Sequence, residues 1–185
     1  AVQLKRRGRF EEARGLWSRV AQESLDATQA LLARLALAEC ELLDNLSSGR
    51  MALELILAQV PAVADPLQRE HIEAQTLSGL VDNLVFAGNM AAARHHAGLL
   101  RPLMPRLRVD DRIHACEVLI ELAMREPDIA AAWSLLAQVK LLAPNNPSTL
   151  SFEGQIHWFA GNALAARDAF DALLANHPAY CSGLT

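Results

Sequence analysis

Aromatic residues are scarce in this chain, at 5% of the sequence, and runs of β-branched residues that would indicate strands are few. Alanine and leucine dominate, and hydrophobic residues make up 52% of the chain. This composition predicts a nearly all-α protein.

Cysteine is too rare and too scattered for a disulfide framework. The three cysteines, Cys40, Cys116 and Cys181, are odd in number and lie far apart in the sequence. Cys40 and Cys116 fall on the inner faces of predicted helices. We therefore expect both to act as small hydrophobic core residues.

Motifs for metal binding and catalysis are absent from the sequence. Neither HExxH nor CxxC occurs, and the adjacent histidines His95 and His96 would point about 100° apart on a helix, a poor chelate. There is also no glycine-rich phosphate loop and no GxSxG elbow. We expect no metal, no cofactor and no enzymatic activity in this segment, although a catalytic domain beyond either end stays open.

No apolar run approaches the roughly 18–20 residues of a membrane span, so we expect no membrane insertion. A signal peptide does not open the chain. The sequence favours a cytoplasmic location, and a periplasmic one would require a signal peptide upstream.

Charge is distributed unevenly behind the net value of −4. Residues 1–20 carry six basic side chains against two acids, whereas residues 21–93 carry three against ten. The basic start lacks interleaved aromatic residues, so a solvated helix face is favoured over a nucleic-acid site. We expect no nucleic-acid partner.

A frame of four residues recurs along the chain, spanning seventeen residues each time. Its members are Gly161, Ala166, Phe170 and Pro178, then Gly88, Ala93, Ala97 and Pro105, and Pro127, Ala132, Leu136 and Pro144. Each unit is too small to bury its own apolar face, so neighbouring units must stack. The frame therefore predicts a helical repeat array.

The spacing and residue pattern of these units resemble the tetratricopeptide repeat. The last two frames are thirty-four residues apart, from Ala132 to Ala166, and the last unit matches best. Its matching residues are Leu150, Gly154, His157, Gly161, Ala166, Phe170 and Pro178, with His157 in place of the usual tyrosine. The residue usage, rich in alanine, leucine and arginine, resembles bacterial versions of this repeat. The resemblance implies a right-handed α-solenoid of stacked antiparallel helix pairs.

We expect a single solenoid domain over residues 1–185. It would hold a partial repeat at 1–27, whose turn lies at Gly8 and Arg9, and repeats at about 28–66, 74–107, 113–146 and 147–180. Residues 179–185 read as the first turn of a further repeat. The chain is therefore expected to be a fragment of a longer protein, and its open repeat ends could self-associate.

Several residues predict where helices end and begin. Gly88 and Gly161 suit the left-handed conformation that closes a helix, with Asn89 and Asn162 as caps of the next. The pairs Asp65-Pro66 and Asn146-Pro147 each provide a cap followed by proline at the first helical position. In the second repeat, the residues Ser47-Ser48-Gly49 indicate the turn.

The resemblance also implies a binding groove, because in this family the first helix of each unit lines the concave wall. The matching positions are Arg34, Leu37, Glu41, Asp44, Gln75, Ser78, Asp82, Val85, His114, Glu117, Glu121, Met124, Ser151, Phe152, Gln155 and Trp158. This wall would be acidic in the middle and aromatic at its far end. Its carboxylates could instead be solvated or paired within the chain, for example with Arg69 and Arg125.

We interpret the chain as a non-catalytic scaffold that binds a protein or peptide in this groove, one with basic residues and an apolar anchor. Glu41, Asp82, Glu117 and Glu121 stand where repeats that grip chaperone tails carry basic or amide side chains, which argues against that subclass. One alternative is a regulatory or sensor segment of a larger bacterial protein that binds a small ligand or its neighbouring domain. Another is an assembly component of an envelope export or secretion machine.

Overall fold

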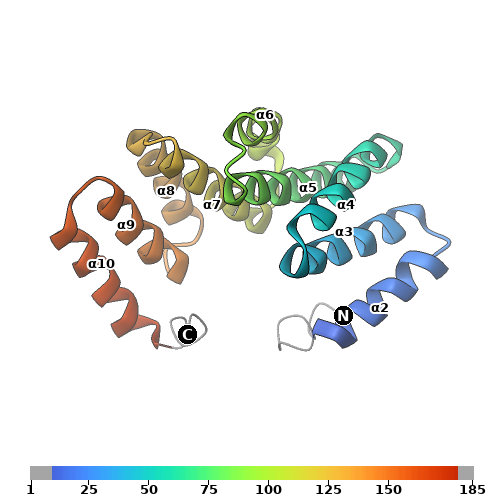
Figure 1. The fold of residues 1–185 in the computed structure, drawn as a ribbon, viewed down its shortest axis with the longest axis horizontal. Coiled ribbons are helices and arrows are strands. Elements are labelled where there is room, and N and C mark those ends of the chain that lie inside the picture. Colours follow the sequence, from blue (N-terminus) through green and yellow to red (C-terminus); the bar gives the residue numbers. More distant parts are fainter. Residues whose placement is uncertain (1–9, 179–185) are drawn as a thin grey trace. The chain divides into compact units, whose positions relative to one another are not determined.

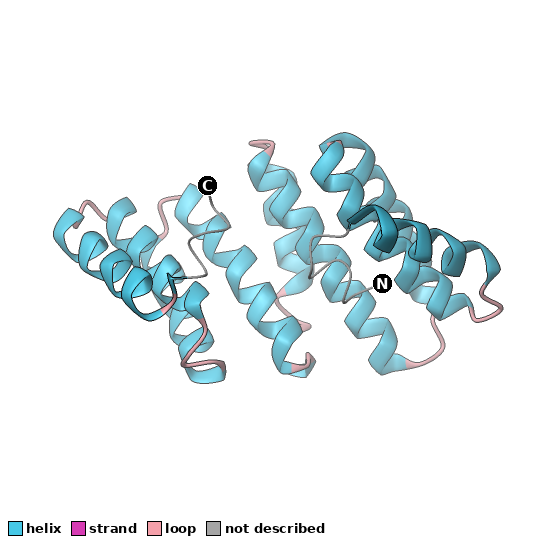
Figure 2. Ribbon diagram, turned by 90° about the horizontal axis from the view of Figure 1, so that it is seen from below, coloured by secondary structure: helices cyan, strands magenta, loops and turns pink. Residues whose placement is uncertain are grey.

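The computed structural model describes residues 10–178, which form nine α-helices and two short 3-10 helices (Figure 1). The elements are α2 (Phe10–Glu23), α3 (Ala27–Asp44), α4 (Leu46–Gln59), η1 (Val60–Ala62), α5 (Pro66–Phe86), α6 (Met90–Leu100), η2 (Met104–Arg106), α7 (Val109–Arg125), α8 (Ile129–Leu142), α9 (Pro147–Phe159) and α10 (Ala163–Asn176). No strand occurs among residues 10–178 (Figure 2), and the expected all-α class is confirmed.

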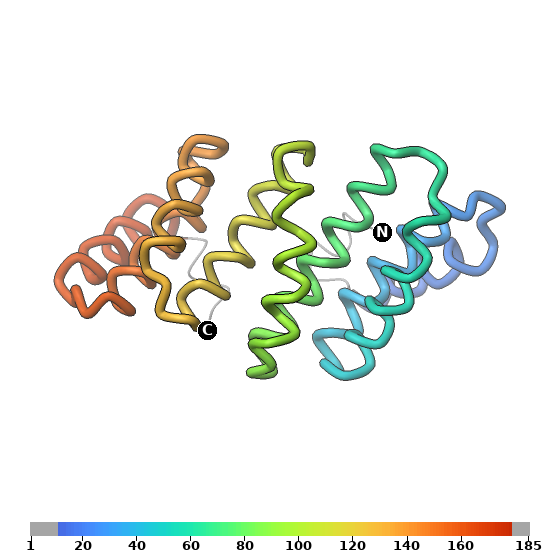
Figure 3. The backbone as a smooth tube through the Cα atoms, turned by 90° about the horizontal axis from the view of Figure 1, so that it is seen from above, coloured from blue at the N-terminus to red at the C-terminus, as the bar shows by residue number. Residues whose placement is uncertain are grey.

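The chain divides into two compact units, with the boundary between Asp111 and Arg112 in the first turns of α7. In the N-terminal unit α2 packs on α3, α3 on α4, α4 on α5 and α5 on α6, and α3 also contacts α5. In the C-terminal unit α8 packs on α9 and α9 on α10, which run side by side (Figure 3). Adjacent helices therefore pack in pairs within each unit.

Two of the predicted helix starts are confirmed. The Oδ1 atom of Asp65 accepts the N–H of Leu67 at 2.9 Å, and Pro66 is the first residue of α5. Asn146 accepts the N–H of Ser148 at 3.0 Å ahead of α9. Each cap satisfies a backbone donor that the first helical turn leaves unpaired.

Both turn glycines adopt the predicted left-handed backbone, with φ of 73° at Gly88 and 79° at Gly161. Asn89 then accepts the N–H of Ala92 at 3.3 Å and caps α6 as expected. Asn162 holds the same place before α10, but its side chain makes no capping bond, so that part of the prediction is wrong.

The turn predicted at Ser47-Ser48-Gly49 is also wrong, because these residues lie in the first turn of α4. Asn45 makes the break instead: it ends α3 and its side chain accepts the N–H groups of Ser47 and Ser48. Gly49 is required by packing, since a Cβ there would lie 2.7 Å from Leu42.

Apolar side chains fill the interior of each unit. In the N-terminal unit the core is built by α3, α4, η1 and α5 from Leu31, Leu35, Ala38, Leu53, Ile56, Val60, Val63, Ile72 and Leu80. In the C-terminal unit Leu136, Val139, Ile156 and Leu173 are buried. The three repeated alanines, Ala93, Ala132 and Ala166, are buried, and Cys40 and Cys116 are buried and unbonded as predicted.

Some sequence predictions lie outside the described residues. These are the turn at Gly8 and Arg9, the repeat start at 179–185, Cys181 and the basic side chains of Lys5, Arg6, Arg7 and Arg9. Over residues 10–178, no helix combines the length and the apolar character that a bilayer crossing requires.

Candidate functional site

One face of α9 carries most of the aromatic surface of the C-terminal unit. Trp158 and Phe159 are 66% and 50% exposed, and Phe152 is half-buried. At about 100° per residue these three side chains and Gln155 fall within an arc of about 120° on the helix. The other faces of α9 hold Ile156 and Gly154, which are buried.

One acidic residue of α7 contacts the first turn of the helix that carries this aromatic face. His114, Glu117 and Glu121 share one face of α7, since they are spaced by three and four residues. Ser148, on the first turn of α9, donates its hydroxyl to Glu117 at 2.5 Å, which places the acidic face of α7 next to α9. Glu117 and Glu121 are half-buried, whereas His114 is exposed.

Six of the ten predicted groove residues belong to the C-terminal unit: His114, Glu117, Glu121, Phe152, Gln155 and Trp158. Gln155 also donates to Ser151 at 3.2 Å along the same face. Phe159 belongs to this surface and was missed by sequence reasoning. Its spacing of seven residues from Phe152 and four from Gln155 is the signal that could have found it.

His157, which takes the place of the usual tyrosine, does not face this surface. Its ring meets Trp133 of α8 edge to face, with centroids 4.8 Å apart. The planar ring therefore serves packing between α8 and α9.

The four predicted groove residues of the N-terminal unit contact their own chain or lie exposed. Asp44 binds Arg14 at 2.5 Å, and this hydrogen bond raises the pKa of Arg14. Glu41 accepts the hydroxyl of Ser48 at 3.3 Å, and Gln75 donates to Asp111 at 3.2 Å. Asp82 is exposed. Pairing within the chain therefore accounts for part of the acidic wall, through partners other than Arg69 and Arg125.

Three further residues assigned to the wall are buried. Ser78, Val85 and Met124 are 1%, 6% and 2% exposed. Because their side chains are buried, they contribute to the packed interior. These three assignments to an exposed wall are wrong.

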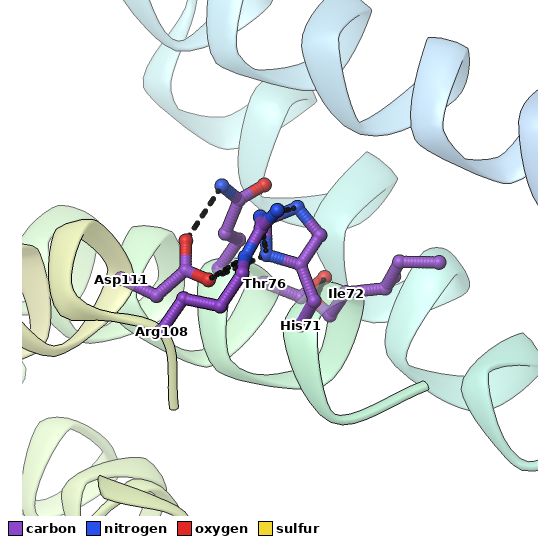
Figure 4. A network of polar contacts seen from close by, with 6 residues as sticks. His71, Ile72, Thr76, Arg108 and Asp111 are labelled. Carbon is purple, nitrogen blue, oxygen red and sulfur yellow. Dashed lines mark hydrogen bonds and ion pairs between the residues drawn. The ribbon is translucent and has the colours of Figure 1, made fainter. Parts of the chain in front are cut away.

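A second polar cluster, not found from the sequence, joins α5 to the start of α7 (Figure 4). Asp111, 7% exposed, accepts from Nδ1 of His71 at 2.7 Å and from Nε of Arg108 at 3.2 Å. Nη2 of Arg108 also lies 2.9 Å from Nε2 of His71. Nη2 lies even closer, at 2.7 Å, to Nδ1. A ring nitrogen that donates to Asp111 cannot also accept from Arg108, so no single tautomer of His71 satisfies all of these contacts.

The paired histidines of α6 form no chelate. The rings of His95 and His96 meet edge to face at 5.3 Å, and burial, followed by the charge of His95, lowers the pKa of His96. Among residues 10–178 no three His, Cys, Asp or Glu side chains are grouped closely enough to hold a metal ion.

Comparisons of this chain with family models, with curated proteins and with solved structures found no match.

Proposed function

We propose that this chain is a protein-interaction scaffold of the tetratricopeptide-repeat type, and that α7 and α9 bind a peptide or helix with basic residues and an apolar anchor. The observation that carries the proposal is the aromatic face of α9, Phe152, Trp158 and Phe159, on a helix whose first turn bonds Glu117 of α7. Only 5% of the chain is aromatic, yet three such residues lie partly exposed on one helix face. Exposed apolar groups gathered in this way are typical of interaction sites.

The chemistry of the two faces supports the choice of partner. A large aromatic side chain such as Trp158 can bury much apolar area at small entropic cost, which is why tryptophan dominates binding hot spots. Glu117 and Glu121 supply negative charge on α7, which would attract lysine or arginine and speed encounter. Gln155, on the same face of α9 as Trp158, offers hydrogen bonds to a peptide backbone.

The repeat architecture supports the same reading. Helices pack in pairs, and in the N-terminal unit α3 contacts α5, which is the neighbour relation expected between the first helices of stacked pairs. A right-handed solenoid would extend this relation along the chain and present the first helices on one wall.

The test is the binding of fluorescently labelled peptides that carry one tryptophan or leucine and several lysines, measured by anisotropy with the 185-residue chain. Matched peptides with glutamate in place of lysine serve as the charge control. We expect Trp158→Ala to weaken binding about 30-fold or more, as for a hot spot worth about 2 kcal/mol. Glu121→Lys should weaken peptide binding more at low salt than at high salt.

Phe86→Ala is the control variant, because Phe86 is 73% exposed but belongs to α5 of the N-terminal unit. It should leave peptide binding unchanged. Equal affinity for lysine and glutamate peptides, or equal loss from Phe86→Ala and Trp158→Ala, would overturn the proposal.

A further inference from the structure

The N-terminal unit contains a pocket of about 420 Å³ that is separate from the peptide surface of α7 and α9. It lies between α3, the first turns of α5 and the segment from Arg106 to Asp111. Leu32, Leu67 and Leu107 supply apolar wall, and Arg106 and Arg108 stand among the polar lining residues. The volume falls in the range of small-molecule sites, about 300–1,000 Å³.

The carboxylates of this pocket are already engaged. Asp111 accepts hydrogen bonds from His71, Gln75 and Arg108 at 2.7, 3.2 and 3.2 Å. Asp65 accepts the backbone N–H of Leu67 at the start of α5. Glu70 pairs with Nη1 of Arg106 at 3.0 Å. Asp111 and Glu70 are therefore paired with the two arginines, while Asp65 caps α5.

The two arginines have donors to spare. A guanidinium carries five N–H groups, and those contacts occupy Nε and Nη2 of Arg108 and Nη1 of Arg106. The side chains are 71% and 60% exposed, so their other nitrogens reach solvent at the pocket. Figure 4 shows Arg108 extended over His71 and Asp111, which fix its position. The N–H groups at Nη1 of Arg108 and at Nε and Nη2 of Arg106 have no contact in this cluster and can each donate to a carboxylate oxygen.

We propose that this pocket binds a small organic acid with an aliphatic tail. The carboxylate is held by the remaining N–H donors of Arg106 and Arg108, and the tail lies against Leu32 and Leu67. This function is additional to peptide binding and involves residues of the N-terminal unit alone. Its failure would leave the peptide-binding proposal untouched.

The experiment is calorimetric titration of the 185-residue chain with butanoate, hexanoate and octanoate, each below its micelle concentration. 1-Hexanol and hexylamine replace the carboxylate with a neutral and a cationic head. We expect saturable binding of the acids, tightening about fourfold per methylene buried, with no binding of the amine. Arg106→Gln should weaken hexanoate at least tenfold, while the charge-matched Arg101→Gln, at the C-cap of the neighbouring α6, should not.

Leu67→Asn tests the contribution of the aliphatic tail separately from that of the carboxylate. Leu67 is 75% exposed, so its replacement should leave the fold intact while reducing the gain in affinity per methylene. The proposal is overturned if the acids show no saturable binding, if hexanol binds as tightly as hexanoate, or if Arg106→Gln and Arg101→Gln behave alike. Tighter binding of a peptide with a free C-terminal leucine carboxylate than of octanoate would also overturn it, in favour of polypeptide C-termini.

Discussion

Gly154 of α9 lies directly under the ring of Phe170 of α10: a Cβ added to Gly154 would come within 2.6 Å of Cε1 of Phe170. This is closer than real Cβ contacts, so only glycine lets the two helices approach as they do. The pairing of a small residue with an aromatic ring one helix away is therefore a close contact between α9 and α10.

Gly154→Ala should destabilise the C-terminal unit. Overpacking costs about 1–3 kcal/mol and the helical preference of alanine returns about 1, so we expect a net loss of about 1 kcal/mol by urea unfolding. Gly98→Ala is the matched control, because nothing lies within 4 Å of a Cβ at Gly98 of α6, and it should gain about 0.5–1 kcal/mol. Combining Gly154→Ala with Phe170→Leu should cost less than the two separate losses; strict additivity would contradict the contact.

Pro127 occupies the turn position that Gly88 and Gly161 fill in the neighbouring sequence repeats. Its φ is 26°, far from the value near −65° that the proline ring favours. Pro127→Gly should therefore stabilise the chain by about 1 kcal/mol through release of backbone strain. Gly161→Ala, at φ 79°, should lose about 1 kcal/mol. A lower unfolding midpoint for Pro127→Gly would show that the turn is not strained.

Burial raises the pKa of the Cys116 thiol to about 11 from a model-compound value of 9.0. Because the thiolate is disfavoured in the folded state, stability is fully retained below pH 9 and falls as pH rises from about 9 to 11. Thermal midpoints measured across that range should therefore fall more steeply with rising pH for the wild type than for Cys116→Ala. Parallel slopes, or alkylation of Cys116 at pH 8 without unfolding, would contradict this expectation.

Asp111→Asn should destabilise the N-terminal unit by about 2 kcal/mol, because three donors lose a charged acceptor. The neighbouring Asp110 is exposed and shares the first turn of α7, so Asp110→Asn is the control for the helix dipole and should cost a few tenths. Chemical unfolding of both variants makes the comparison. Equal losses would mean that the cluster around His71 contributes nothing beyond the dipole.

Sequence reasoning succeeded where the signal is local. Asp65-Pro66 and Asn146-Pro147 mark helix starts because a cap and a first-turn proline act within a few residues, and Gly88 and Gly161 are set by backbone sterics. It failed at Ser47-Ser48-Gly49, where serine and glycine suit a turn by composition but Asn45 caps the helix two residues earlier.

Contacts distant in sequence were out of reach. His71 and Asp111 are 40 residues apart, and nothing in either segment signals that they meet. Likewise, the family pattern placed Ser78, Val85 and Met124 on an exposed wall, but the pattern gives a helix face only to within one or two positions, and packing decides which side of that face is covered. Phe159 was overlooked for the same reason.

Asn45 alone connects α3 to α4, since α3 ends at Asp44 and α4 begins at Leu46. A connection of one residue leaves almost no loop to close, so the two helices can find each other at minimal entropic cost. Pairing of α3 with α4 should thus precede contacts between more distant segments as the chain folds. The shortest link between α-helices within residues 10–178 would then be the place where folding starts, and lengthening it with glycines would slow refolding more than it speeds unfolding.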